Sequence, residues 1–118
     1  MLAVGERRLG SIDRRLKRLT SVFAGGVGGS RAEMCGALSA GVMIIGALHG
    51  RSELSEDEEE SGRMARGFRE RFCSEYGSTQ CAIVREKHLA PDGSTNCTPV
   101  VERAAVLLLE TLDGQESA

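Results

Sequence analysis

The chain has 118 residues, a length typical of one domain, and its formal net charge of −2 argues against a general nucleic-acid binder. Hydrophobic residues make up 41% of the chain and aromatic residues only 3%, so the core must be aliphatic, which suits packed helices better than a sheet sandwich. No signal-peptide stretch opens the chain, and its longest uncharged run, residues 34–48, is shorter than the roughly 20 residues that span a bilayer. We therefore expect a soluble, cytoplasmic protein with no membrane insertion and no nucleic-acid partner.

The first predicted helix covers residues 11–23, and the ten residues before it are expected to be flexible. Apolar side chains recur there at helical spacing, at Ile12, Leu16, Leu19 and Phe23. The other faces carry arginines and a lysine, with no aromatic residues between them. We interpret this basic surface as a solvated helix face, with an anionic partner as the less favoured alternative.

A glycine-rich segment, residues 24–29, separates this helix from the next one. It is not a dinucleotide-binding fingerprint, because no strand precedes it and the G-x-G-x-x-G spacing is absent. Glycine tolerates positive φ angles, so this segment is expected to turn tightly into the following helix.

A central, buried helix is predicted for residues 30–49. Ser30 is expected to be its N-cap, Glu33 to complete a capping box, and Gly50 to end it. We interpret His49, in the last turn, as structural. The segment is apolar nearly all round, which is typical of a buried helix. Glycines cost a helix roughly 1 kcal/mol each and here favour close helix packing, at Gly36, Gly41 and Gly46.

The next predicted helix begins in an acidic run at residues 53–60 and ends at Gly77. Negative charge is favoured at a helix start by the helix dipole, and a metal-binding acidic cluster is the alternative interpretation. Helical spacing directs four large side chains of this helix toward the core: Met64, Phe68, Phe72 and Tyr76.

The C-terminal third is predicted to hold a short helix at residues 78–86, a loop at residues 87–96, and a last helix that Thr98 caps. Residues 114–118 are expected to be flexible. No segment alternates at period two, so the sequence predicts an all-α fold. We expect one helical domain over residues 1–118, built as a small bundle of four to five helices around the central buried apolar helix.

Three of the four cysteines fall at predicted helix N-termini: Cys35, Cys81 and Cys97. Unpaired N–H groups and the positive end of the helix dipole favour a thiolate there. If these ends converge, they form a site for thiol chemistry or for a soft metal. We interpret Cys73 as structural and His88 as a surface loop residue. In a reducing cytosol, cysteines are more typical of ligands, redox thiols or core positions than of disulfides, and no C-x-x-C pair indicates a zinc finger.

Several segments around these cysteines follow a known pattern. They are residues 23–29, 33–37 and 50–51 around Cys35, residues 68–81 up to Cys81, and residues 97–105 from Cys97 onward. Together they resemble the C_GCAxxG_C_C family of redox-active proteins, over roughly residues 16–112. The resemblance implies a small helical protein, often bacterial, with four characteristic cysteines for redox or metal chemistry. It also implies that Cys35, Cys81 and Cys97 are family cysteines.

The chain departs from this family pattern at two places. Ala40 stands where the closing glycine of the motif is expected, with Gly41 one place later. The family's first cysteine belongs to a helix upstream of the first predicted helix, and this chain has no cysteine before Cys35. We therefore expect a divergent or N-terminally truncated member. Cys73, or a second copy in a homodimer, would then complete a four-cysteine site.

Three functions fit these residues. The favoured one is thiol–disulfide or electron-transfer chemistry at Cys35, Cys81 and Cys97 with an unidentified redox partner, which needs two cysteines whose Cα atoms lie within about 7 Å. The alternative is a metal or iron–sulfur binding module that uses the same cysteines, with Cys73 or His88 as a fourth ligand. The third is a non-catalytic helical scaffold that pairs with itself or with a partner and whose cysteines are merely buried.

Overall fold

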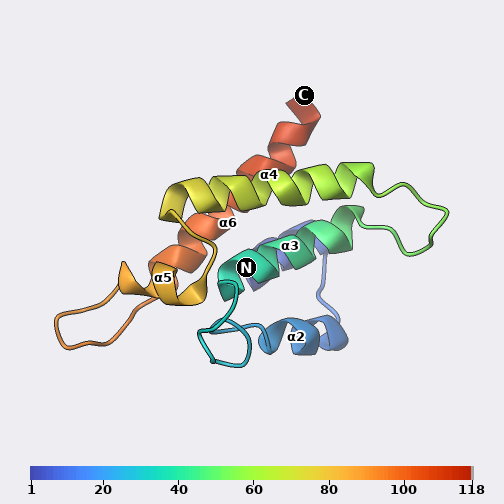
Figure 1. Cartoon of the computed structure of the whole chain (residues 1–118). Coiled ribbons are helices and arrows are strands. Elements are labelled where there is room, and N and C mark those ends of the chain that lie inside the picture. Colours follow the sequence, from blue (N-terminus) through green and yellow to red (C-terminus); the bar gives the residue numbers. More distant parts are fainter. Residues whose placement is uncertain (118) are drawn as a thin grey trace.

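The computed structural model describes residues 1–117, and this part of the chain forms six helices and no sheet (Figure 1). In chain order the helices are α1 (Leu2–Leu9), α2 (Arg14–Ser21), α3 (Gly36–His49), α4 (Glu59–Tyr76), α5 (Cys81–Glu86) and α6 (Thr98–Ser117). The predicted all-α fold is confirmed. None of these helices is both long and apolar enough to cross a membrane.

Helix α3 is the centre of the bundle, as predicted. It contacts α4 and α6, which also pack against each other, and it contacts α1 and α2. In Figure 1, α3 runs between α4 on one side and α2 on the other. The most deeply buried side chains come from α3, α4, α5 and α6: Leu38, Ile45, Met64, Phe68, Phe72, Val84, Val100 and Leu108.

Gly41 and Phe68 determine how closely α4 approaches α3. Phe68 is fully buried, and its ring lies against the backbone of Gly41, so that a Cβ atom at position 41 would overlap two ring carbons. A glycine inside a helix lowers its intrinsic stability. Here it also leaves the space that the ring fills. The predicted close helix packing is thus confirmed at Gly41, but it is wrong at Gly46, where an added Cβ would meet no heavy atom within 4 Å.

The buried helix begins at Gly36 rather than at Ser30, so the predicted capping box is wrong. Cys35 is the N-cap residue, and the Ser30 hydroxyl donates to the carbonyl oxygen of Gly26 instead of capping a helix. The Cys35 N–H donates to the carbonyl oxygen of Thr79 at 2.8 Å, which ties the segment before the helix to a distant part of the chain. This long-range bond outweighs a local capping signal.

Three other helices begin later than expected. Helix α5 begins at Cys81 rather than near residue 78, with Gln80 as its N-cap residue, and the Ser78 hydroxyl accepts the Gln80 N–H. Helix α2 begins at Arg14 rather than near residue 11, because the Asp13 carboxylate accepts a hydrogen bond from the Arg15 N–H and caps the helix there. Helix α4 begins at Glu59, so most of the acidic run lies in the preceding loop.

The two ends of the chain are more helical than expected. The structure places α1 in residues 1–10, and its Val4 belongs to the hydrophobic core. Helix α6 continues to Ser117 through most of the segment expected to be flexible, and residue 118 lies outside the described residues.

We expect Gly41→Ala to lower the free energy of unfolding by about 1–3 kcal/mol, because the added methyl group overlaps the Phe68 ring. Gly46→Ala in the same helix is the matched control. An added Cβ there meets no heavy atom within 4 Å, so stability should rise by up to about 1 kcal/mol. Urea unfolding followed by circular dichroism measures both changes. Equal effects would contradict the close packing of α3 against α4.

Candidate functional site

A short backbone pairing sets Cys35 and Cys81 beside each other. Met34 and Gln80 form an isolated antiparallel bridge. Across it, the Cys35 N–H donates to the opposite segment at 2.8 Å and the Cys81 N–H donates back at 2.9 Å. Side chains alternate between two faces along such a pair. The two cysteines, each one residue beyond the bridge, therefore share a face as diagonal neighbours, a relation that places residues roughly 7–8 Å apart.

Cys97 reaches the same region from the segment before α6. Its carbonyl oxygen accepts the N–H of Val101 at 3.0 Å, and the Asn96 side chain accepts the N–H of Thr98 at 3.0 Å. These bonds hold Cys97 directly before the first turn of α6. Each of the three cysteines thus lies at the start of a helix, although Cys35 caps α3 rather than lying in its second turn.

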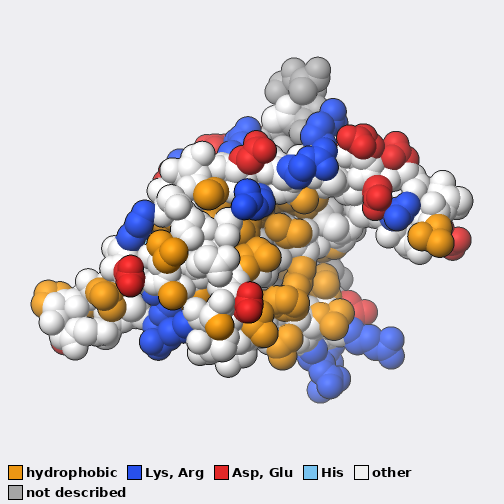
Figure 2. Space-filling model, in the orientation of Figure 1, with side chains coloured by type: hydrophobic (Ala, Val, Ile, Leu, Met, Phe, Trp, Pro, Cys, Tyr) orange, Lys and Arg blue, Asp and Glu red, His pale blue; other side chains and the backbone are white. Residues whose placement is uncertain are grey.

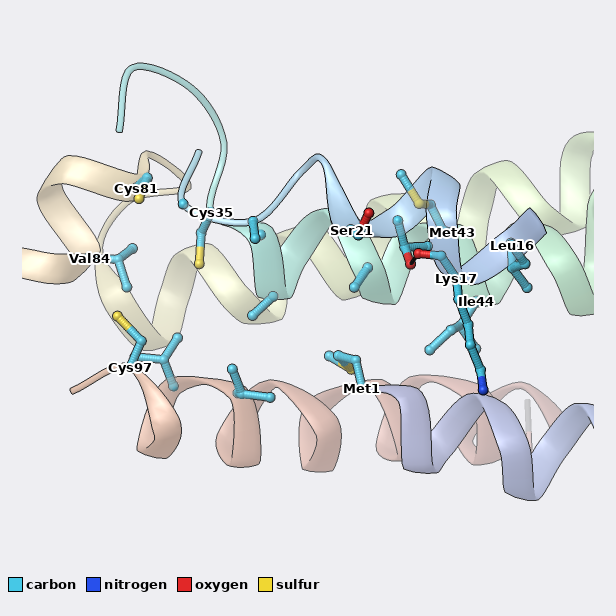
Figure 3. Close-up of a pocket in the computed structure, with 18 of the residues that line it drawn as sticks. Met1, Leu16, Lys17, Ser21, Cys35, Met43, Ile44, Cys81, Val84 and Cys97 are labelled. Carbon is cyan, nitrogen blue, oxygen red and sulfur yellow. Dashed lines mark hydrogen bonds between the residues drawn. The ribbon is translucent and has the colours of Figure 1, made fainter. Parts of the chain in front are cut away.

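All three cysteines line one cavity of about 430 Å³. Figure 3 shows their side chains gathered at one end of it, together with Val84. Cys81 is buried, Cys35 and Cys97 are half-buried, and each is a free thiol. The structure therefore brings together the three cysteines that the sequence singled out, in a confined space with largely aliphatic walls.

Burial decides the acidity of Cys35. Removal from water raises the pKa of the Cys35 thiol, and the nearby backbone N–H groups of Ala37 and Leu38, which lower this pKa, offset only part of the effect. Negative charge on Cys81 or Cys97 would raise the pKa of Cys35 further, so both lie within electrostatic range of it. The start of α3 therefore does not make Cys35 the acidic thiol that its position predicts.

The candidates for a fourth ligand lie elsewhere. Cys73 is a half-buried residue of α4 and His88 a half-buried residue just after α5, and neither lines this cavity. His88 packs edge-on against Tyr76, with ring centroids 6.0 Å apart, so it is not the surface residue that we expected. Among the side chains that the structure describes, no three from His, Cys, Asp or Glu are grouped so that they could hold a metal ion.

The glycine-rich segment covers the bridged cysteines. Five consecutive residues, 25–29, have positive φ angles between 61° and 73°. Four of them are glycines, which adopt this conformation without strain, and the fifth is Val27, which adopts it at 72°. A Cβ atom at Gly26 would lie 2.7 Å from Cβ of Cys81 and 3.1 Å from the Glu33 carbonyl oxygen. The sequence predicts the turn, but it does not reveal that Gly26 lets this loop pack directly on Cys81.

The cavity walls farther from the sulfur atoms come from residues that the sequence did not connect with the site. Ile12, Leu16 and Met1 line this part. The helical spacing of Ile12 and Leu16 predicts an inward-facing stripe. It gives no sign that the stripe faces an open space rather than a closed core.

We expect Cys35 to react with iodoacetamide more slowly at pH 7 than an unburied cysteine, because its raised pKa leaves less thiolate. Its rate should continue to rise above about pH 8.5, where an unperturbed cysteine is half ionised. In a variant with Cys81→Ser and Cys97→Ser, the pH profile of Cys35 should move to lower pH, because no negative charge can then form at these positions to oppose the ionisation of Cys35. Peptide mass spectrometry measures the rate at Cys35. If the alkylation rate of Cys35 depended on pH as the rate of a cysteine in a free peptide does, the raised pKa of Cys35 would be contradicted.

Comparison with known proteins places the chain in a family. The family model described as "Putative redox-active protein (C_GCAxxG_C_C)" matches residues 1–111 of the 118. No curated protein and no solved structure matches the chain. The match covers α1 and α2 as well as the three cavity cysteines, and the description of the family supports a redox-related role in general. Over nearly its whole length, the chain belongs to the C_GCAxxG_C_C family.

Proposed function

We propose that this protein performs thiol–disulfide redox chemistry in which two of Cys35, Cys81 and Cys97 cycle between the dithiol and the disulfide. The observation that carries the proposal is that these three free thiols line one end of one cavity. The family's redox description supports it in general terms. Free thiols also fit a reducing compartment such as the cytoplasm.

The exposure of the three thiols and the pKa of Cys35 indicate which thiol attacks and which closes the disulfide. Cys81 is only 4% exposed, whereas Cys97 is half-buried at the start of α6 and more open to an external disulfide. Cys35 lies within electrostatic range of both other cysteines. Cys35 is half-buried like Cys97, but its raised pKa leaves it less thiolate than an unperturbed cysteine has. We therefore assign Cys97 as the thiol that attacks an external disulfide and Cys35 as the thiol that closes on it.

The reaction has two exchange steps. The Cys97 thiolate attacks one sulfur of the external disulfide, whose S–S bond breaks as a mixed disulfide forms, and the leaving sulfur takes a proton. Cys35, having lost its own proton to solvent, then attacks the Cys97 sulfur and releases the second thiol. Two electrons pass from the protein to the external disulfide, and the protein keeps a Cys35–Cys97 disulfide.

A small aromatic disulfide reagent tests this order by stoichiometry. The reduced protein should release two thiols for each fast attack, one on formation of the mixed disulfide and one on closure. Cys35→Ser should stop after the first release, and Cys97→Ser should lose most of the fast phase. Rapid-mixing absorbance measures both phases.

Cys73→Ser is the matched control, because Cys73 is half-buried like Cys35 and Cys97 but does not line the cavity. It should leave both releases unchanged. A second release that survives Cys35→Ser would remove Cys35 from the closing role. Thiols that react only after unfolding would overturn the redox proposal and favour a scaffold with buried cysteines.

The metal alternative relies on the same three sulfur atoms. Thiolates are the preferred ligands of zinc and of iron–sulfur clusters. Because no three described donors are grouped to hold an ion, this function would require the segments that carry the cysteines to move together. Metal and sulfide analysis of anaerobically purified protein, with an ultraviolet–visible spectrum, tests it. Stoichiometric iron and sulfide would favour a cluster over simple thiol exchange.

A further inference from the structure

The cavity is elongated, and its two ends differ in chemistry. Figure 3 shows the cysteines at one end and Leu16 and Lys17 of α2 toward the other. Along α3, the walls run from Gly36 to Ile44, which is roughly 12 Å at the rise of an α-helix.

The wall between these ends is aliphatic and incompletely packed. Ile12, Leu16, Met43 and Ile44 line it. Helix α2 has no buried residue, although its Leu16 is half-buried on the cavity side. Figure 2 shows hydrophobic side chains gathered in the middle of this face, with lysine and arginine side chains at the edge where α2 lies. An aliphatic chain would therefore find apolar surface along the cavity and positive charge at its far end.

Lys17 supplies positive charge at the end away from the sulfur atoms. Its only ion pair among the described residues is with Glu6 at 4.0 Å, and both side chains are about half exposed, at 49% and 53%. Exposed ion pairs of this kind are weak, so the ammonium group of Lys17 can leave Glu6 and bind the carboxylate of a ligand. The hydroxyl groups of Thr20 and Ser21 donate to the carbonyl oxygens of Lys17 and Arg18, so Lys17 is the group of this helix left to bind a carboxylate.

Arg85 is the other cation of the cavity, and it belongs to the sulfur end. It follows Cys81 by four residues on α5 and so shares its face of the helix. Its guanidinium donates to the Thr95 hydroxyl at 2.5 Å, which holds it beside the loop after α5. Lys17 is therefore the cation placed to bind the far end of an elongated ligand.

We propose that the cavity binds an aliphatic disulfide with a terminal carboxylate, the disulfide against the cysteines and the carboxylate at Lys17. A length of roughly 12 Å along α3 suits an extended acid of medium chain length. This inference rests on the proposed thiol function and names its substrate class. Two electrons and two protons convert the bound disulfide to a dithiol while two protein thiols become a disulfide.

Lipoic acid, a cyclic disulfide on an aliphatic acid, is the probe. The reduced protein should convert it to the dithiol faster than it reduces oxidised glutathione, which lacks the aliphatic chain, or lipoamide, which lacks the charge. Chromatography of anaerobic reactions measures all three rates. Octanoic acid, which has the chain and the charge but no disulfide, should bind in calorimetry and inhibit the reaction with lipoic acid.

Lys17→Gln should weaken octanoic acid binding about two- to five-fold, because an exposed charge pair is lost. Arg14→Gln is the matched control: Arg14 is an exposed cation on the same helix that does not line the cavity, so affinity should not change. A loss with Arg85→Gln but not with Lys17→Gln would overturn the placement of the carboxylate.

Two further outcomes separate this inference from the function on which it rests. If oxidised glutathione is reduced at least as fast as lipoic acid and octanoic acid does not bind, the substrate class is wrong while the thiol function stands. If none of the three disulfides is reduced, the thiol function itself fails, and the disulfide substrate fails with it.

Discussion

Two backbone hydrogen bonds between distant segments organise this protein. The N–H groups of Cys35 and Cys81 donate across the bridge between Met34 and Gln80. These bonds set where α3 and α5 begin, and they put two thiols on one face. The glycine-rich loop then packs on Cys81 because Gly26 has no side chain. The cysteine end of the cavity is thus fixed mainly by the backbone.

At the cysteine end of the cavity, burial and the start of α3 have opposite effects on the pKa of Cys35. Helix N-termini offer N–H groups to a thiolate, and the N–H groups of Ala37 and Leu38 do act to lower the pKa of Cys35. Removal from water still dominates and raises the pKa of Cys35. A thiol with a raised pKa, such as the half-buried Cys35, is less readily oxidised and suits a second, closing step. The half-buried Cys97 suits the first step, because an external disulfide can reach it.

Local patterns in the sequence predict much of this fold. Apolar periodicity indicates the central helix and the inward face of α4, and helix boundaries place Cys81 and Cys97 at helix starts. The start of α3 could not be predicted, because a bond from Cys35 to Thr79 competes with the capping signal at Ser30. The apolar spacing in α2 can be recognised in the sequence. Whether Leu16 packs in a closed core or lines a cavity depends on helices that are distant in the sequence. The cavity and the role of Lys17 therefore emerge only from the tertiary structure.

The central claim is that Cys35, Cys81 and Cys97 act together in one cavity while Cys73 stands apart. Peptide mass spectrometry after mild oxidation of the native protein tests it most directly. We expect an intramolecular disulfide within these three residues, chiefly between Cys35 and Cys97, that a mild reductant reverses. A disulfide that involves Cys73, or none before the protein unfolds, would contradict it.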